Sequence, residues 1–258
     1  MSRTIADAFA GGKAFIPFVT AGDPDLFTTE SIVYAMEEAG ASLIELGIPF
    51  SDPTAEGPVI QAANERALSG GVTTDDIFEM VSRIRNKTDI PLVFMTYDNV
   101  VFSYGTEKFV KRCSEVGISG LILPDVPFEE KGEFAQVCKD GGIDLISMVA
   151  PTSHERITDI ASEAAGFLYC VSSLGVTGTR TNITTDVGAM TAIAKKANPN
   201  LPTAIGFGIS SPESAARMAA SADGVIVGSA IVKLIAEHGR ESVPYVKDFV
   251  KSIVEAIR

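Results

Sequence analysis

The chain has 258 residues, of which 46% are hydrophobic, which is enough for a substantial core and too many for a disordered chain. Its formal charge of −12, without any basic run, argues against nucleic acid or an anionic membrane as the main partner. Three widely spaced cysteines, which we interpret as reduced thiols, and two solitary histidines support neither a metal site nor a Ser–His–Asp triad.

Along the chain, short apolar runs alternate with segments of helical spacing, most of which end at glycine or another small residue. A first helix is expected at 2–10. The expected strands, in order, are 14–20, 43–48, 91–96, 121–123, 144–149, 167–172, 203–206 and 224–227. The further expected helices, in order, are 28–38, 59–68, 74–85, 106–116, 129–139, 154–165, 185–197, 212–220, 229–237 and 243–257.

This alternation of strands and helices predicts an α/β fold. The strands are nearly all apolar, as in a parallel sheet that is buried on both faces. Eight such units in a chain of this length favour a closed (β/α)8 barrel, the TIM barrel, over an open doubly wound sheet. No linker divides the chain, so we expect residues 1–258 to form a single domain with an extra N-terminal helix. Extended loops follow strands 2 and 6, at 47–57 and 172–186, and are candidate lids.

One charged residue, Glu45, stands within the apolar run of the second strand. Because side chains alternate along a strand, Glu45 lies on the face opposite to Ile44 and Leu46, which we expect to face the helices. Glu45 therefore points into the barrel, near the rim where active sites of such barrels lie. Burial there would raise its pKa and suit it to proton transfer, and the alternative is a buried carboxyl that only bonds a polar neighbour. Tyr169, in the sixth strand, is placed to reach it.

A second signal is three glycine-bearing loops after the last three strands: GVTG (175–178), GFGIS (206–210) and GSA (228–230). Glycine lets a phosphate approach backbone N–H groups closely, and a helix that starts at Ser229 would add its positive N-terminal end. Barrels of this class often bind phosphate after strands seven and eight. The three loops together predict a phosphorylated ligand held mainly by the backbone.

These residues belong to longer motifs by which the sequence resembles the α subunit of tryptophan synthase. The motifs, in order, are LIELGIPFSDPTAEGPVIQ (43–61), MTYDNVVFSYG (95–105), LPDVPFEE (123–130), SSLGVTGTR (172–180), GFGISSPE (206–213) and GSAIVK (228–233). The resemblance spans nearly the whole chain. It implies a (β/α)8 barrel that cleaves indole-3-glycerol phosphate to indole and glyceraldehyde 3-phosphate, a lyase reaction in the last steps of tryptophan biosynthesis.

The resemblance also implies roles for individual residues. Glu45 would be a catalytic acid/base, and Glu56 would be the second carboxyl, at a position where the family usually has Asp in the pattern D-G-P. One extra methylene moves that carboxylate by roughly 1.5 Å unless the loop adjusts. The implied substrate-binding residues are Phe18, Tyr97, Pro124, Tyr169, Phe207 and the lid residue Thr177. The implied phosphate-binding residues are Gly178, Gly208, Gly228 and Ser229.

The resemblance implies that the chain needs no cofactor or metal of its own. Its partner would be a β subunit that uses pyridoxal phosphate, in an αββα heterotetramer, and the 47–57 loop and residues 99–104 would face that subunit. The N-terminus has no signal-peptide pattern and no apolar run has membrane length, so we expect a cytoplasmic protein.

Three other interpretations stay open at this point. Another phosphate-binding barrel, such as an indole-glycerol-phosphate synthase, would keep the glycine loops but would need a lysine-centred site. A regulatory or scaffold subunit would have weak chemistry because Glu56 replaces Asp. A stand-alone lyase would release indole without a β subunit.

Overall fold

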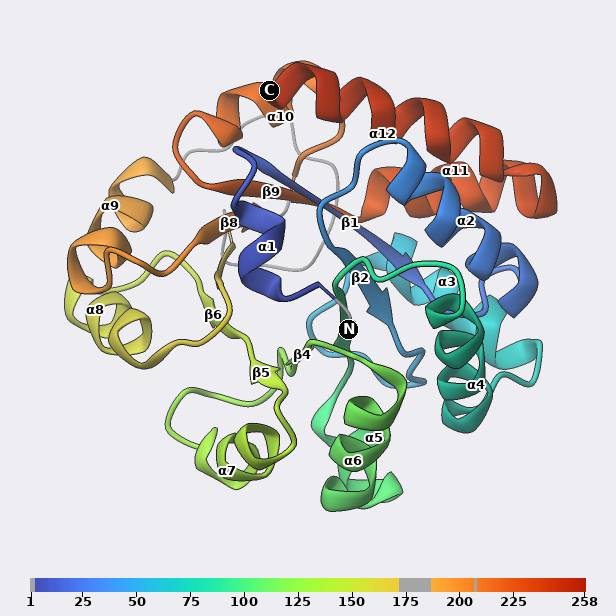
Figure 1. Cartoon of the computed structure of the whole chain (residues 1–258), viewed down its shortest axis with the longest axis horizontal. Coiled ribbons are helices and arrows are strands. Elements are labelled where there is room, and N and C mark those ends of the chain that lie inside the picture. Colours follow the sequence, from blue (N-terminus) through green and yellow to red (C-terminus); the bar gives the residue numbers. More distant parts are fainter. Residues whose placement is uncertain (1–2, 172–186, 207) are drawn as a thin grey trace.

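The computed structural model describes residues 3–171, 187–206 and 208–258. Nine parallel strands form a nearly closed barrel in the order β5-β4-β3-β2-β1-β9-β8-β7-β6, surrounded by the helices (Figure 1). The strands are β1 (Ala14–Thr20), β2 (Ile44–Gly47), β3 (Leu92–Met95), β4 (Gly120–Ile122), β5 (Asp144–Leu145), β6 (Ser147–Val149), β7 (Leu168–Val171), β8 (Thr203–Gly206) and β9 (Gly224–Val227). The expected (β/α)8 barrel is therefore confirmed.

The helices follow the expected order, and a short 3-10 turn, η1 (Gly239–Glu241), precedes the last one. They are α1 (Ile5–Phe9), α2 (Leu26–Glu38), α3 (Pro58–Ser69), α4 (Thr74–Arg85), α5 (Asp98–Tyr104), α6 (Thr106–Val116), α7 (Gly132–Asp140), α8 (His154–Glu163), α9 (Val187–Ala197), α10 (Pro212–Ala219), α11 (Ser229–His238) and α12 (Val243–Ile257). Among the described helices, none has the length and apolar character needed to cross a membrane.

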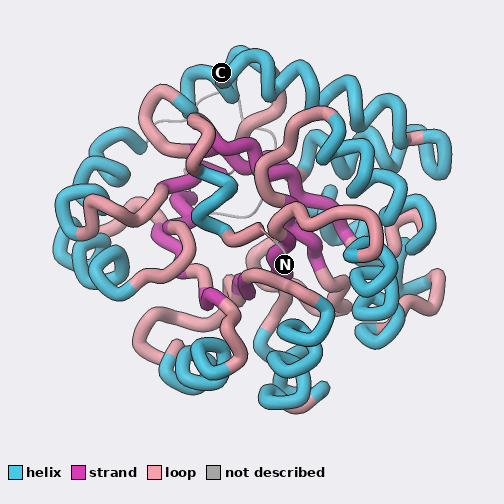
Figure 2. The backbone as a smooth tube through the Cα atoms, viewed as in Figure 1, coloured by secondary structure: helices cyan, strands magenta, loops and turns pink. Residues whose placement is uncertain are grey.

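The fifth expected strand is divided by a single residue, Ile146, into β5 and β6 (Figure 2). β5 pairs with β4, whereas β6 pairs with β7, so the two halves bond to opposite neighbours. The N–H of Ile146 donates to the carbonyl of Leu121 at 2.9 Å, which continues the pairing on the β4 side. One strand thus closes the ring, pairing with β4 through its first half and with β7 through its second half.

Two apolar layers build the core, and the alternation within β2 shows how they separate. Ile44 and Leu46 pack in the outer layer between strands and helices. Leu43 packs in the barrel interior, together with Phe167. The helix α1 lies across one end of the barrel in Figure 1, and its Phe9 ring stands 5.8 Å from the Phe167 ring. That end is therefore filled by packing, which leaves the opposite end, where the strands finish, for a site.

The helices differ from the expectation most at two places, beside boundary shifts of one to three residues elsewhere. The segment expected as a loop at 96–105 contains α5, whose first N–H, on Asp98, donates to both carboxylate oxygens of Asp125 at 3.1 Å. This acceptor comes from the loop after β4 and has no local sequence signal. The helix expected at 129–139 begins at Gly132, because 129–131 form the preceding turn. The extended loop expected at 172–186 lies outside the described residues.

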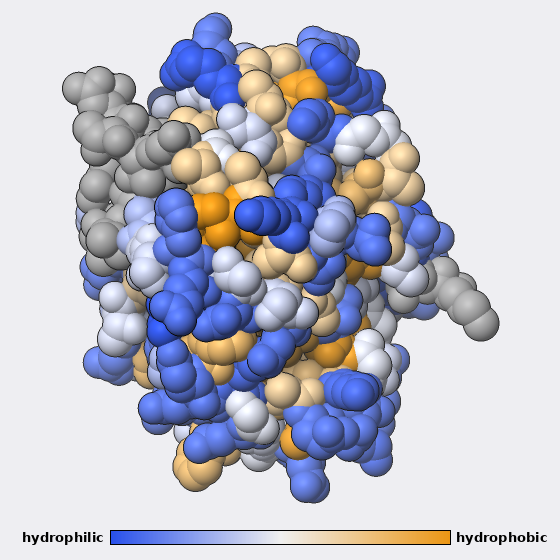
Figure 3. Space-filling model, turned by 90° about the vertical axis from the view of Figure 1, so that its left-hand side faces the viewer, coloured by the Kyte–Doolittle hydropathy of each residue, from blue (hydrophilic) through white to orange (hydrophobic). Residues whose placement is uncertain are grey.

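The side of the molecule that carries α8 and α9 is shown in Figure 3. Among the residues coloured there, hydrophilic side chains dominate and apolar ones form small separate patches. On α8, Ile157, Ile160 and Ala161 are the buried positions, and the remaining residues face outward. This is the pattern of an outer barrel helix with one buried stripe.

Candidate active site

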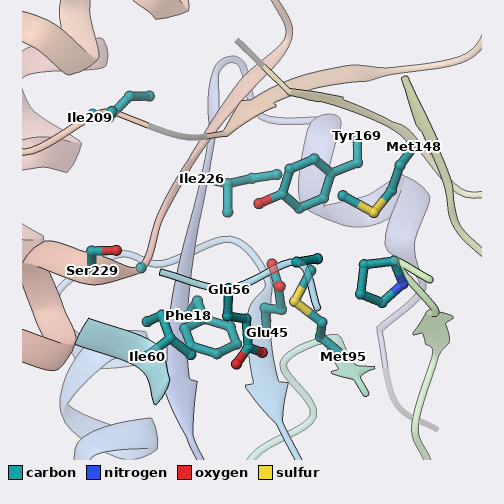
Figure 4. Close-up of a pocket in the computed structure, with 14 residues that line it drawn as sticks. Phe18, Glu45, Glu56, Ile60, Met95, Met148, Tyr169, Ile209, Ile226 and Ser229 are labelled. Carbon is teal, nitrogen blue, oxygen red and sulfur yellow. The ribbon is translucent and has the colours of Figure 1, made fainter. Parts of the chain in front are cut away.

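A cavity opens where the strands end, with about 690 Å³ of empty space when its open mouth is included (Figure 4). Strand residues, loop residues and the start of α11 contribute to its wall. The lining residues are Phe18, Glu45, Ala55, Glu56, Ile60, Met95, Pro124, Met148, Tyr169, Gly208, Ile209, Ile226, Gly228 and Ser229. Glu45 and seven other predicted site residues are in this wall, so most of the predicted site lies around one cavity.

Glu45 is held by β2 in register with Phe18 of β1 and Val93 of β3. Its side chain is 1% exposed, and its Oε2 atom has no hydrogen-bond partner among the described residues. Burial, together with the charge of Glu56, raises the pKa of Glu45 from 4.5 to about 8. Near neutral pH Glu45 is therefore mainly protonated and can donate that proton into the cavity.

Glu56 reaches the same cavity from the loop after β2 and is 8% exposed. Its Oε2 accepts a hydrogen bond of 2.7 Å from the Nδ2 of Asn64, one turn and a half into α3. Burial raises the pKa of Glu56 from 4.5 to about 7, while the bond from Asn64 opposes that rise. Glu56 therefore ionises before Glu45 does as the pH increases.

The helix α3 is fixed by an ion pair at its far end. Asp23, in the loop after β1, is 1% exposed, and its two carboxylate oxygens accept from Nε and Nη2 of Arg66 at 2.8 and 2.7 Å. Such a fork-to-fork pair defines an orientation as well as a distance. It holds the helix that presents Ile60 to the cavity and Asn64 to Glu56.

Glycines make room for the two aromatic rings of the cavity. A Cβ atom at Gly47 would lie 2.6 Å from the Phe18 ring, and one at Gly228 would lie 3.2 Å from it. A Cβ atom at Gly206 would lie 2.5 Å from the hydroxyl oxygen of Tyr169. A larger residue at Gly47 or Gly206 would therefore displace a ring, and at Gly228 the Phe18 ring would have to give by a few tenths of an ångström.

The two ends of the cavity differ in character. At one end Gly228 caps α11, whose first residue is Ser229, and Gly208 has a φ of 75° that favours glycine. The N–H groups in the first turn of a helix lack intrahelical partners and attract anions. Met148 and Tyr169 line the other end, opposite Ser229 in Figure 4. The cavity thus has one end suited to an anion and one suited to an aromatic ring.

The remaining predicted residues are placed as follows. Pro124 lines the cavity, whereas Tyr97 stands behind the loop that carries Glu56 and accepts a 3.2 Å hydrogen bond from the Ala55 N–H. Thr177, Gly178 and Phe207 lie outside the described residues.

Sequence reasoning missed several wall residues and the partner of Glu56. The missed wall residues are Ala55, Ile60, Met95, Met148, Ile209 and Ile226. A usable signal existed for Met148, because it pairs in register with Tyr169 and alternation turns both side chains to one face. Within the described part of the chain, no group of three or more His, Cys, Asp or Glu side chains could hold a metal ion.

Around neutral pH the cavity holds one carboxyl that keeps its proton and one that gives it up. Two carboxyls whose environments separate their pKa values are an arrangement suited to paired acid and base roles. With an anion end beside them, the site suits proton transfers on a phosphorylated substrate that carries an apolar ring.

Comparison with known proteins gives a consistent result. The family model described as tryptophan synthase alpha chain matches residues 6–256. A tryptophan synthase alpha chain from Lacticaseibacillus casei is 47% identical over 98% of this chain and 95% of its own length. The alpha chain from Thermoanaerobacter sp. (strain X514) is 51% identical over 96% of this chain and 95% of its own length.

Solved structures give the same answer. The alpha chain of Legionella pneumophila superposes with a TM-score of 0.89 at 36% identity, covering 100% of this chain and 97% of that one. A chain of the tryptophan synthase complex from Pyrococcus furiosus superposes with a TM-score of 0.86 at 34% identity, covering 95% and 98%.

Proposed function

The chain belongs to the tryptophan synthase alpha chain family, and from this premise we propose which of its residues carry out the reaction. The reaction is the cleavage of indole-3-glycerol phosphate to indole and glyceraldehyde 3-phosphate in tryptophan biosynthesis, which makes the protein a carbon–carbon lyase. The observation that carries the assignment of residues is the pair of carboxyls in one cavity, Glu45 with a pKa of about 8 and Glu56 with a pKa of about 7.

Cleavage of the bond at indole C3 is a retro-aldol step with three requirements. C3 must gain a proton, the side-chain hydroxyl next to the ring must lose one, and the ring nitrogen becomes positive in between. We assign the first transfer to the protonated Glu45, whose proton passes to C3. The ionised Glu56 faces the ring N–H and stabilises the positive charge. Glu45, now a carboxylate, then takes the hydroxyl proton as the carbon–carbon bond breaks and its electrons return to the ring.

We propose that the phosphate binds at the α11 end of the cavity, on the backbone of Gly208, Gly228 and Ser229. The dipole of α11 and the N–H groups of its first turn support this placement. Gly178, from the segment outside the described residues, is proposed for the same group on the family motif alone.

The indole ring is proposed to bind at the other end of the cavity. The wall residues Pro124 and Tyr169 offer apolar faces there, and Phe18, which lies next to Gly228, is proposed to contact the substrate nearer to its phosphate. Tyr97 is proposed to act indirectly, by holding the Ala55 backbone next to Glu56. Thr177 and Phe207 are proposed on the motif alone.

We propose that the chain works with a β subunit, in an αββα assembly in the cytoplasm, and that pyridoxal phosphate belongs to that subunit alone. The similarity to a chain of the Pyrococcus furiosus tryptophan synthase complex supports a β partner. Residues 99–104, which include the exposed Phe102 of α5, and the 47–57 loop are proposed to face that subunit on the family motif.

The test is an indole-release assay on indole-3-glycerol phosphate, with and without a cognate β subunit. We expect Glu45→Gln to lower the rate by about 10²–10⁴-fold, the usual contribution of a positioned general acid. Glu255→Gln, at an exposed position on α12, is the matched control and should leave the rate unchanged. Retention of full activity in Glu45→Gln would overturn the assignment. If the wild-type chain releases no indole even with the β subunit, the interpretation of the chain as a regulatory or scaffold subunit would be favoured instead.

A further inference from the structure

A second cavity lies at the break between β5 and β6. It has a volume of about 970 Å³, mouth included. Its wall includes residues 145–149, which span the break, together with the loop after β4 and the first part of α8. Because β5 pairs with β4 whereas β6 pairs with β7, the cavity lies between β6 and the segment that follows β4.

This second cavity adjoins the active-site cavity through two shared residues, Pro124 and Met148. Met148 lies in β6, paired in register with Tyr169, and is half-buried. In Figure 4 its thioether stands beside the Tyr169 ring, at the end of the active-site cavity opposite Ser229. The Met148 side chain and the Pro124 ring therefore form the partition between the two cavities.

The second cavity is lined mainly by apolar side chains, with Ser147 and Thr152 also in its wall and charged residues at its edge. Leu123, Val149 and Ile160 contribute buried apolar surface. At the edge, Lys131 bonds to Glu163 at 2.8 Å, and its ammonium group lies 4.0 Å from the centre of the Phe128 ring.

Arg156 makes a two-pronged bond to Glu129 on the same edge. Both edge cations are thus paired, and both pairs tie the loop after β4 to α8. The interior therefore suits an uncharged apolar group rather than an anion.

From these contacts we propose that the second cavity is an auxiliary subsite for apolar substituents on the aromatic ring of the substrate, and that Met148 is the specificity-determining residue that controls entry to it. This proposal rests on the proposed function, because a phosphate at Ser229 directs the ring of the substrate toward Met148. The unbranched side chain of Met148 can change rotamer. Met148 therefore limits the size of the ring substituents that can pass, but it does not block the passage completely.

The test compares Met148→Ala with Met95→Ala. Met95 is the matched control, because it lines the active-site cavity but is not in the wall of the second one among the described residues. The substrates are indole-3-glycerol phosphate and its four derivatives with bromine at ring positions 4, 5, 6 or 7. The readout is kcat/KM for each derivative divided by kcat/KM for the parent, measured in the same variant, so that a general loss of activity cancels.

We expect Met148→Ala to raise this ratio at least about tenfold for one or more derivatives, in line with the discrimination that small apolar volume changes provide. Met95→Ala should not raise it for the same derivative. Adding Ile160→Phe, which fills the second cavity from α8 without lining the first, should cancel the gain. No gain in Met148→Ala, an equal gain in Met95→Ala, or a gain that survives Ile160→Phe would each overturn the proposal.

Calorimetric titration with the four bromoindoles separates this proposal from the function it rests on. If the wild-type chain releases no indole, the proposed function fails. Tighter bromoindole binding in Met148→Ala, lost again with Ile160→Phe, would still support the subsite, and unchanged binding would refute it.

Discussion

Replacing Glu45 by Gln should make the free energy of unfolding less sensitive to pH. In the folded chain the pKa of Glu45 is about 8, against an ordinary value of 4.5. Between these two pH values the folded state holds a proton that the unfolded state has released. Stability is therefore fully present below pH ~4.5 and is lost progressively as the pH rises toward the folded pKa.

The size of the effect follows from the shift. Integrating the linkage relation from about pH 5.5 to about pH 8.5 gives a loss of roughly 3 kcal/mol from Glu45 alone. Glu56, with its pKa raised to about 7, adds a loss of the same sign that both proteins share. Wild type should thus lose roughly 3 kcal/mol more than Glu45→Gln over this range.

Urea unfolding at several pH values measures this difference, with the slope on urea concentration checked for constancy. Glu255→Gln is the control for the loss of a carboxylate at an exposed position and should follow wild type. Parallel pH curves for wild type and Glu45→Gln would refute the reasoning, because they would mean that Glu45 ionises in the folded chain without cost.

Three further predictions concern the supports of the site. Asn64→Leu removes the hydrogen-bond donor at 2.7 Å from Glu56 and so raises the pKa of Glu56. The acid limb of the pH profile of kcat/KM, expected near pH 7, should therefore move to higher pH. An unmoved limb would mean that it does not report the ionisation of Glu56. Glu56→Asp should lower kcat/KM at least about tenfold, because the shorter side chain retracts from Asn64, and a gain would contradict this. Arg66→Met should lower the free energy of unfolding by roughly 3 kcal/mol in urea, because it leaves Asp23 buried without its partner. Adding Asp23→Asn to Arg66→Met should recover part of this loss, because the buried charge is then removed.

Glu45 could be located from the sequence because three local signals agree. It interrupts an apolar strand, alternation assigns it to the inner face, and the run ends at turn residues that mark the rim. The glycine loops were readable for a similar reason, since Gly228 and Ser229 stand at a strand-to-helix junction. The structure places all of these residues at one cavity.

Features set by contacts between distant segments could not be read in this way. Asn64 bonds to Glu56 only because α3 turns back over the loop, and a helix position alone does not specify which way its side chain faces that loop. The break at Ile146 cannot be read from the sequence, because Leu145, Ile146, Met148 and Val149 together have the pattern of one continuous strand. The sequence therefore identifies Met148 as a strand residue, but not as part of the partition between the two cavities.

The division of the fifth strand also has a consequence for how the ring of strands assembles. β5 and β6, at the two ends of the strand order, are consecutive segments separated by one residue, so the chain joins them without closing a loop. The strands β1 and β9, which pair from Ala14 to Gly224, lie about two hundred positions apart, and closing so long a loop costs about 5 kcal/mol of chain entropy. The largest loop-closure entropy in the ring therefore belongs to the β1–β9 pairing and not to the divided strand. We expect this pairing, which joins the first and last strands, to form late in folding, after the contacts between neighbouring segments.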